Sequence, residues 1–215
     1  MQPLQQDQYW KKRTERKEKR EPTEFVKSCV EFLENKSHET ILDLGCGDGR
    51  DSVFFAKRGY EVTAADVSPV ALQILKKKIS EEKITNIKII EQNLQNLQFP
   101  ENSFDVIYAH LSLHYFLDEQ TTNIFKNIYK ILKQDGFLFI KCKSIEDEEY
   151  GKGKEVEENV FVTEENYLRH FFDEEYMKEK LARFKIIKIE KTKGTYEGLQ
   201  GEKTSHFIEA IATKT

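Results

Sequence analysis

A glycine turn beside a carboxylate is the part of this sequence best suited to bind a charged ligand. Asp43 stands two residues before Gly45-Cys46-Gly47-Asp48-Gly49, in an apolar run that predicts a buried strand. Glycines let the chain turn tightly and let a ligand touch the main chain. The GxxxxGK[ST] pattern of a phosphate loop is absent, and Arg50 stands where a dinucleotide fingerprint needs its last glycine. The carboxylate favours a cationic ligand group, such as the amino group of an amino acid.

A second carboxylate, Asp66, follows the next apolar run, 17 residues after Gly49. An acid at the end of the second strand of an open α/β sheet can accept hydrogen bonds from both hydroxyls of a ribose. The ligand predicted here therefore carries a ribose and a positive charge, and it needs no phosphate. The alternative is an accidental glycine turn, with Asp66 capping the helix that follows.

Two histidines and a tyrosine follow the fourth predicted strand. His110 and His114 are four residues apart, so they would share one face of a helical turn, and either could take a proton from a bound acceptor. Tyr115 is the third candidate for this catalytic role. Simple packing is the alternative for each of the three. The histidines lack a third ligand and the three cysteines stand far apart, so the sequence predicts no metal site.

The elements that must position these residues alternate between strands and helices. This alternation predicts an α/β fold, a doubly wound and mostly parallel sheet with helices on both faces. Residues 144–159 are acidic and almost free of apolar side chains, which predicts a mobile loop. The predicted strands span residues 40–44, 60–65, 87–91, 104–109, 137–142, 185–191 and 206–213. The predicted helices span residues 24–34, 51–58, 69–82 and 119–132, with a short helical stretch within 164–181.

From Thr40 to Cys142 the chain resembles the class I S-adenosylmethionine-dependent methyltransferases, through the D-x-G-x-G-x-G pattern at Asp43 and the acid after the second strand. The resemblance implies a Rossmann-like sheet of seven strands, S-adenosylmethionine as the methyl donor and S-adenosylhomocysteine as the product. It implies that Asp66 holds the ribose, that the glycine turn contacts the methionine part, and that the segment after the third strand binds adenine. The implied cofactor-binding residues are Asp43, Gly45, Cys46, Gly47, Gly49, Asp66, Val67, Asn93, Leu94 and His110.

Within this family the chain looks closest to the tellurite-resistance and thiopurine type, whose acceptors are small molecules. Residues 49–52, 9–13 and 167–172 carry this resemblance. It implies that the run 9–13 forms a lid over the site and that the run 167–172 reaches the acceptor. The alternative for the first of these is an ordinary amphipathic helix on the edge of the sheet. The residues implied to cover or face the acceptor are Tyr9, Trp10, Arg13, Arg169 and His170.

The chain of 215 residues is long enough for one α/β domain, predicted as residues 39–215 behind an N-terminal helical lid or extension, residues 1–38. No apolar run reaches about 18 residues, which predicts no membrane span, and the polar start has no secretory signal. Sparse cysteines favour a reducing compartment, the cytoplasm. The net charge of -4 gives no general attraction to nucleic acid, so the basic run Lys11–Arg20 is predicted to be a solvated helix face.

The predicted function is methyl transfer by direct displacement to a small-molecule acceptor, one with a soft nucleophile or a simple oxygen or nitrogen group. We expect the protein to be a monomer or a homodimer. The Asn-Pro-Pro-Tyr and Pro-Cys motifs of base-methylating enzymes are absent. Two alternatives stay open: a methyltransferase that acts on protein or RNA, and a module that binds S-adenosylmethionine without turnover.

Overall fold

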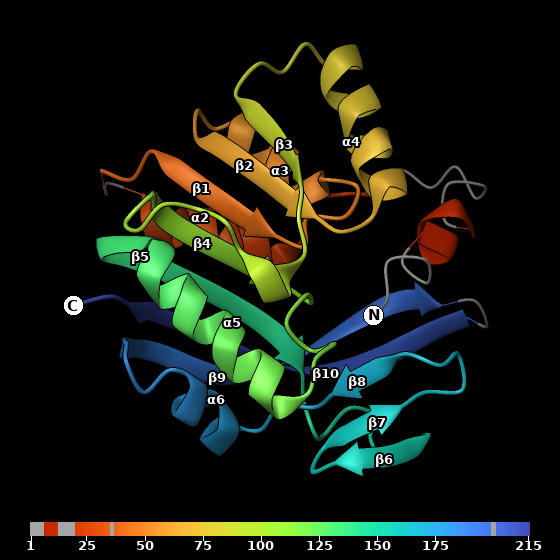
Figure 1. Ribbon diagram of the computed structural model, residues 1–215. Helices are drawn as coiled ribbons and strands as arrows, with labels where there is room; N and C mark the ends of the chain where they lie inside the picture. Colours follow the sequence, from red (N-terminus) through yellow and green to blue (C-terminus); the bar gives the residue numbers. More distant parts are fainter. Residues whose placement is uncertain (1–6, 13–19, 35–36, 199–200) are drawn as a thin grey trace.

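A seven-stranded sheet forms the centre of the molecule (Figure 1). The computed structural model describes residues 7–12, 20–34, 37–198 and 201–215. The strand order is β3-β2-β1-β4-β5-β10-β9, in which β1 to β5 run parallel and β10 runs antiparallel to both its neighbours. This order confirms the predicted doubly wound, mostly parallel sheet. The strands are β1 (Thr40–Leu44), β2 (Glu61–Asp66), β3 (Ile87–Glu91), β4 (Phe104–His110), β5 (Leu132–Lys143), β9 (Lys185–Gly198) and β10 (Gly201–Thr213).

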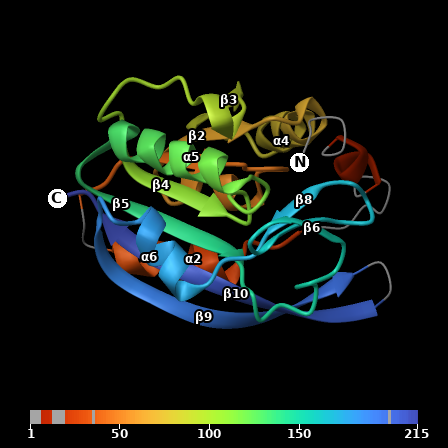
Figure 2. The same ribbon diagram turned by 60° about the horizontal axis from the view of Figure 1, so that its bottom comes forward.

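Helices cover both faces of this sheet (Figure 1 and Figure 2). In β1, Ile41 packs in the cluster formed with α2 and α3, whereas Leu42 and Leu44 pack in the cluster formed with α5 and α6. Burial on both faces explains why a central parallel strand is apolar throughout. None of the described helices is long and apolar enough to cross a membrane. The helices are α2 (Glu24–Leu33), α3 (Arg50–Ala56), α4 (Pro69–Glu81), η1 (Leu94–Asn96), α5 (Asp118–Ile131) and α6 (Glu174–Lys180).

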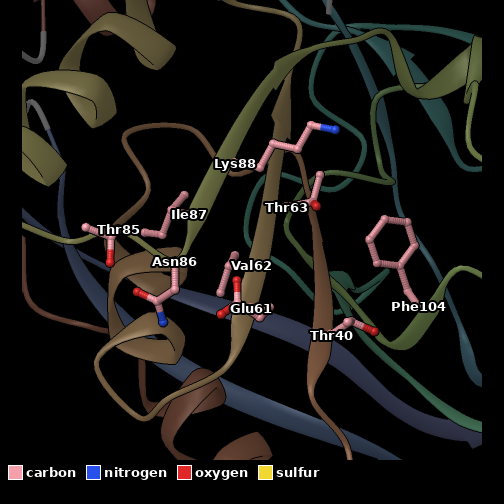
Figure 3. Close-up of a pocket in the computed structure, with 9 residues that line it drawn as sticks. All are labelled: Thr40, Glu61, Val62, Thr63, Thr85, Asn86, Ile87, Lys88 and Phe104. Carbon is pink, nitrogen blue, oxygen red and sulfur yellow. The ribbon is translucent and has the colours of Figure 1, made fainter.

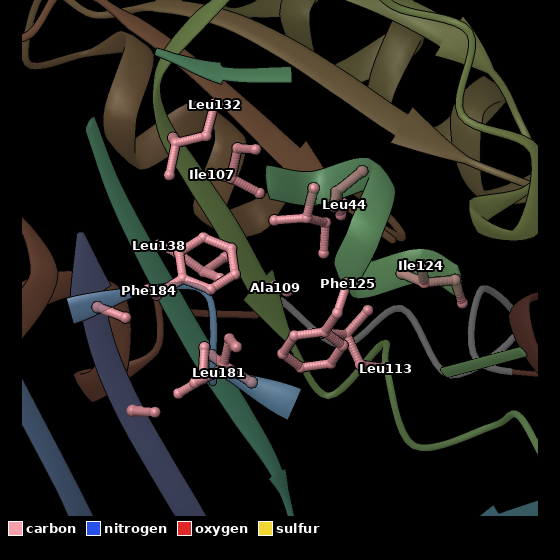
Figure 4. Close-up of a cluster of buried hydrophobic side chains, with 14 of the residues drawn as sticks. Leu44, Ile107, Ala109, Leu113, Ile124, Phe125, Leu132, Leu138, Leu181 and Phe184 are labelled. Atoms are coloured by element: carbon pink, nitrogen blue, oxygen red, sulfur yellow. The ribbon is translucent and has the colours of Figure 1, made fainter. Parts of the chain in front are cut away.

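The buried cluster between α5 and the sheet also holds the segment that follows β4 (Figure 4). Helix α5 contributes Ile124 and Phe125, and the strands contribute Ile107 and Leu138. Leu113, which comes from the segment after β4, is fully buried in the same cluster. The packing of Leu113 therefore holds the segment with the candidate catalytic residues His110, His114 and Tyr115 against the core.

Helix α4 begins where the sequence predicts, directly after β2. The Ser68 side chain accepts a hydrogen bond from the Ala71 N–H at 3.2 Å, and Pro69 occupies the first helical position. This cap satisfies one of the free donors at the start of the helix. The N-cap Ser68 lies two residues after Asp66, the last residue of β2.

The C-terminal half departs from the prediction at residues 144–159. Three further strands, β6 (Lys154–Glu157), β7 (Val160–Val162) and β8 (Leu168–His170), form a separate antiparallel sheet. The prediction of a loop through residue 159 is therefore wrong for β6. Every residue of β6 is exposed, so this strand has no apolar alternation, and only its pairing with β7 defines it.

Three other strands are longer than predicted. β5 begins at Leu132, because the strand continues through Asp135, at a φ of 61°, and through Gly136. A Cβ on Gly136 would lie 2.8 Å from the carbonyl oxygen of Asp105, so glycine is needed there. The left-handed residue Asp135 is therefore a local irregularity inside the strand. β9 and β10 pair with each other well beyond the residues of β10 that pair with β5, as a two-stranded hairpin.

Candidate cofactor and acceptor site

The glycine turn lies at the carboxyl ends of β1 and β2, the edge where open α/β sheets bind ligands. The Gly45 and Cys46 N–H groups donate to the carbonyl oxygen of Ala65, at the end of β2, at 2.8 and 3.0 Å. Gly45 has a φ of +76°, and a Cβ on it would lie 2.4 Å from the Cβ of Ser112. Glycine at this position therefore brings the turn into contact with the segment that follows β4.

Asp43 lies beneath the turn. It is 2% exposed, and its carboxylate accepts a hydrogen bond from the hydroxyl of Ser52, in α3, at 2.5 Å. Burial raises the pKa of Asp43 to about 8. A cation placed beside this carboxyl group would favour its charged form. The amino group of a methionine moiety, which the sequence predicts here, has that charge.

Asp66 joins the glycine turn to helix α4. One carboxylate oxygen accepts the Gly47 N–H at 2.8 Å, and the other accepts the Ser68 N–H at 2.9 Å. Burial raises the pKa of Asp66, although these backbone hydrogen bonds oppose the shift. Each carboxylate oxygen can accept a second hydrogen bond. Contact with a ribose, which the sequence predicts, is compatible with this arrangement and stays a prediction.

The residues predicted at the adenine end follow β2 and β3 on the same edge. Val67 is half-buried, and Leu94 is buried in the core. Asn93 is exposed, and its side chain accepts the Gln95 N–H at 3.0 Å, which caps η1. The Gln92 N–H donates to the carbonyl oxygen of Asp66 at 2.9 Å. The structure thus brings the predicted ribose and adenine residues together at neighbouring strand ends.

A helical turn formed by residues 7–12 covers this edge. Trp10 is 8% exposed, and a Cβ on Gly47 would lie 2.4 Å from its ring. The indole therefore rests directly on the glycine turn. Asp7 accepts a hydrogen bond from the Ser68 hydroxyl at 2.5 Å, so the same short helix also contacts the start of α4.

An ion pair adds to this cover. Arg20 donates to the carboxylate of Asp48 at 2.8 Å, and its guanidinium carbon lies 5.5 Å from the centroid of the Trp10 ring. Tyr9 is 45% exposed and packs edge-on against Trp10, with the ring centroids 5.2 Å apart. The structure therefore brings Tyr9 and Trp10 to the glycine turn. Arg13, the third predicted lid residue, lies outside the described residues.

The segment after β4 is irregular, and its histidines do not share a helix face. Residues 111–116 form bends, and Leu111 has a φ of 55°. His110 and His114 would share a face only on a helical turn, and this segment forms none. The ring of His110 lies 5.9 Å from that of Phe25, and loss of solvation lowers the pKa of His110 well below its usual value. Within the described part of the chain, no group of three ligands could hold a metal ion.

His114 meets Arg169, a residue predicted from the other end of the chain. The Nε2 atom of His114 lies 2.9 Å from Nη1 of Arg169, and Nδ1 accepts the Lys143 N–H at 3.2 Å. The guanidinium carbon of Arg169 lies 5.1 and 5.2 Å from the ring centroids of Tyr115 and Tyr167. Burial raises the pKa of Tyr115 to about 12, so its hydroxyl keeps its proton at neutral pH.

His170 lies next to Arg169 in β8 and makes packing contacts. Its Nδ1 atom lies 3.1 Å from the carbonyl oxygen of Phe116, and its ring centroid lies 4.8 and 4.6 Å from those of Phe172 and Tyr176. Burial lowers the pKa of His170 to about 4, so the ring is neutral at physiological pH. Contact between His170 and an acceptor stays a prediction.

The sequence reasoning did not single out two polar groups in this region. The Ser112 hydroxyl is buried without a hydrogen-bond partner, and the residue touches Gly45. Asp51 accepts hydrogen bonds from the hydroxyls of Tyr108, at 2.8 Å, and of Thr23, at 3.0 Å, which ties α2, α3 and β4 together. The run 49–52 contains Asp51 and was a usable signal, whereas nothing local marks Ser112.

A cavity of about 260 Å³ lies away from this site (Figure 3). It opens at the amino ends of β1 to β4, whereas the glycine turn stands at the carboxyl ends. Parallel sheets bind ligands at the carboxyl ends, so we do not assign the cofactor to this cavity. Its lining residues are Thr40, Glu61, Val62, Thr63, Thr85, Asn86, Ile87, Lys88 and Phe104.

The class of protein follows from the sheet order, the glycine turn and a match to a known family. Residues 41–136 match the family described as "Methyltransferase domain". This part of the chain is thus similar to methyltransferase domains, in agreement with the resemblance to the class I, S-adenosylmethionine-dependent type that the sequence shows.

Individual relatives agree with this class. A protein from Geobacillus sp. (strain WCH70), named as a methyltransferase, is 34% identical over 122 residues, which are 56% of this chain and 49% of that protein. The chain spans about half the length of the curated relatives it matches.

Two solved structures show the same fold. The crystal structure of TehB from Haemophilus influenzae has a TM-score of 0.69 at 20% identity, over 88% of this chain and 62% of that one. The 1,6-didemethyltoxoflavin-N1-methyltransferase of Burkholderia thailandensis, solved with 1,6-didemethyltoxoflavin and S-adenosylhomocysteine, has a TM-score of 0.65 at 20% identity. That match covers 89% of this chain and 79% of the neighbour.

Proposed function

We propose that this protein transfers a methyl group from S-adenosylmethionine to a small-molecule acceptor. The observation that carries the proposal is Asp66, whose carboxylate joins Gly47 to the start of α4 at the carboxyl edge of the sheet. Asp43 fits the same cofactor, because a cationic amino group beside this buried carboxyl group would favour its charged form and pair with it. Bound there, S-adenosylmethionine would supply an electrophilic methyl group on a positively charged sulfur.

The reaction is a direct displacement in which a bond to the methyl carbon forms while the carbon–sulfur bond breaks and the electron pair stays on sulfur. His110 is the candidate proton acceptor, and loss of solvation lowers the pKa of its ring well below the usual value and keeps the ring neutral. The acceptor nitrogen of a neutral His114 ring is already used by the Lys143 N–H. A neutral imidazole can accept the proton that an acceptor releases. Holding the acceptor in line with the methyl group supplies much of the rate.

The covered edge supports a small acceptor. Trp10 rests on Gly47, and Arg20 pairs with Asp48, so described parts of the N-terminal 38 residues close over the turn. We propose that this N-terminal part acts as a lid. A covered site suits a small molecule better than a folded protein or an RNA. The toxoflavin-precursor methyltransferase, which shares the fold, was solved with a small molecule bound.

Cofactor binding can be measured with Trp10, which is the single tryptophan of the chain. Because the indole rests on the glycine turn, S-adenosylhomocysteine is expected to change its fluorescence. Asp66→Ala should weaken binding by about tenfold or more, since charge-assisted hydrogen bonds are lost. Asp173→Ala is a matched control, because that carboxylate accepts the Tyr176 N–H at 2.7 Å at the start of another helix. Equal losses in both variants would contradict the proposal.

Turnover can be followed with methyl-tritiated S-adenosylmethionine and a cell extract, with the label sorted into small-molecule, protein and RNA fractions. We expect label among the small molecules, and we expect Asp66→Ala to remove it. Stable label in protein or RNA would overturn the proposal of a small-molecule acceptor, but it would still support methyltransferase activity. Binding without any transfer would identify a module without turnover.

A further inference from the structure

Arg169 is a buried cation that forms no ion pair with any carboxylate of the described residues. It is 8% exposed, and its Nε–H group has no hydrogen-bond partner. The charge of Glu149 acts on Arg169, but Glu149 forms its ion pair with Lys143, at 3.6 Å. A buried charge without an opposite charge is costly. The position therefore favours a ligand that brings a negative charge.

The contact between Arg169 and His114 points to the same kind of ligand. The Lys143 N–H can only donate, so Nδ1 of His114 accepts and a neutral ring carries its proton on Nε2. Nη1 of Arg169, 2.9 Å from Nε2, is also only a donor. Loss of solvation lowers the pKa of His114 well below its usual value and keeps the ring neutral. Two donors thus face each other, and an oxyanion beside them could accept from both.

The surroundings of Arg169 are aromatic and adjoin the glycine turn. The rings of Tyr115 and Tyr167 flank the guanidinium group, and the Tyr167 hydroxyl accepts from Nη2 at 3.0 Å. Ser112, two residues before His114, touches Gly45 and has a buried hydroxyl without a partner. An anionic group bound to Arg169 would therefore lie near the cofactor edge.

The main chain holds this arrangement in register. The His170 N–H donates to the carbonyl oxygen of His114 at 3.0 Å, and the Phe172 N–H donates to that of Lys143 at 2.8 Å. Strand β8 is therefore attached to the segment after β4 and to the end of β5, beside which it lies in both views (Figure 1 and Figure 2). Preorganised donors bind a ligand with a smaller entropy cost.

We propose that Arg169 and the Nε2–H group of His114 bind a carboxylate carried by the methyl acceptor. The proposal rests on the proposed methyltransferase function and names its substrate class, a small carboxylic acid. The planar fork of arginine matches the two oxygens of a carboxylate. The carboxylate is a handle that orients the acceptor toward the glycine turn.

The test uses the full chain saturated with S-adenosylhomocysteine and titrated by calorimetry with benzoate, benzamide and phenyl phosphate. Benzoate should bind about tenfold or more tightly than benzamide, because the amide lacks the charge. Arg169→Gln should weaken benzoate binding by about tenfold or more, and Arg169→Lys by less. Arg183→Gln is the matched control, since it removes an exposed guanidinium group 4.1 Å from the ring centroid of Tyr129. It should leave benzoate binding unchanged.

A spectroscopic signal separates binding from general structural damage. In protein labelled with ¹⁵N-histidine, benzoate should shift the ring signals of His114, and benzamide should leave them in place. His114→Gln identifies these signals by their loss. A shift with both ligands, or with neither, would count against the subsite.

The affinity for S-adenosylhomocysteine, measured first for every protein, keeps the two proposals apart. Failure of the unaltered protein to bind it would overturn the proposed function. Normal cofactor binding with equal or absent binding of benzoate and benzamide would overturn the carboxylate subsite alone. A preference for phenyl phosphate, or benzoate binding unaffected by Arg169→Gln, would do the same. If Arg169→Gln no longer binds S-adenosylhomocysteine, the affinities for benzoate and benzamide are compared in Arg169→Lys instead. Benzoate binding that is unaffected by Arg169→Lys would then overturn the subsite.

Discussion

The cofactor half and the acceptor half of the site are built from different kinds of contact. In the cofactor half, backbone groups of Gly45 and Gly47 are bound by the carbonyl oxygen of Ala65 and the carboxylate of Asp66. In the acceptor half, the central contact joins side chains 55 residues apart in the sequence, His114 and Arg169.

Contacts made by the backbone fix the path of the chain, whereas side chains can be replaced without altering the fold. The cofactor half is therefore suited to one constant ligand, and the acceptor half can differ between related proteins. The difference teaches that substitutions in the two halves should fail in different ways. Changes that disturb the backbone of the glycine turn should damage the fold, and changes to side chains that contact a ligand should damage binding.

The largest effect is expected from Gly45→Ala. Its φ of +76° disfavours alanine, and the new Cβ would lie 2.4 Å from the Cβ of Ser112. We expect the free energy of unfolding to fall by about 3 kcal/mol and cofactor binding to be lost. Gly59→Ala is the control, because Gly59 has a φ of +90° with nothing within 4 Å, so only about 1 kcal/mol should be lost. Equal losses in urea unfolding would show that crowding at the turn is unimportant.

The second effect is a change in pH dependence, tested with Asp43→Asn in the absence of cofactor. Burial raises the folded pKa of Asp43 from 3.8 to about 8, so the folded state binds this proton more tightly than the unfolded state. The stability this proton contributes is fully present below the unfolded pKa and is lost as the pH rises toward 8. Asparagine still accepts from Ser52 but does not titrate. Urea unfolding from pH 4 to pH 8 should therefore show a smaller decline in the variant.

Asp105→Asn is the control for this change in the free energy of unfolding with pH, which we call the slope. Burial opposes the charge on Asp105, but hydrogen bonds from Thr40 and Lys133 outweigh it and lower the pKa to about 2. The stability contributed by this carboxylate is present above its unfolded pKa and is lost as the pH falls toward 2. Asp105→Asn should lower stability evenly between pH 4 and pH 8 without altering the slope. A slope unchanged by Asp43→Asn would show that Asp43 is charged in the folded protein.

A smaller effect is expected from Trp10→Ala, which removes the ring that rests on Gly47. Loss of a buried aromatic contact should weaken binding of S-adenosylhomocysteine by about tenfold, measured by calorimetry. Tyr9→Ala is the neighbouring control. Because Tyr9 is 45% exposed, we expect a change within about twofold. Unchanged affinity and turnover in Trp10→Ala would reject the lid.

The smallest effect is expected from Arg20→Gln, which removes the ion pair with Asp48 at 2.8 Å. Cofactor affinity should fall about threefold at low salt, and less at high salt because ions screen the pair. Lys27→Gln removes a more exposed pair with Glu24 and should leave affinity unchanged. An equal effect of the two variants would show that the Arg20 contact does not support the lid.

The local structure of the proposed cofactor half could be predicted because its signals are local. Three short patterns each predict the local structure at the place where they stand. They are the glycines after an apolar strand, the acid at the end of the next strand and Ser68 before Pro69. Strand β6 could not be predicted, because its exposed residues leave no apolar alternation. The irregular path of the segment with His110 and His114 could not be predicted either, because it depends on Leu113 packing in the core.

The residue order thus determined the alternation of strands and helices, the place of the glycine turn and the class of cofactor. The tertiary structure decided that Trp10 rests on Gly47 and that His114 meets Arg169. Such contacts join segments that are far apart along the chain. They depend on the direction in which packed elements carry their side chains, and no local pattern of residues records that direction.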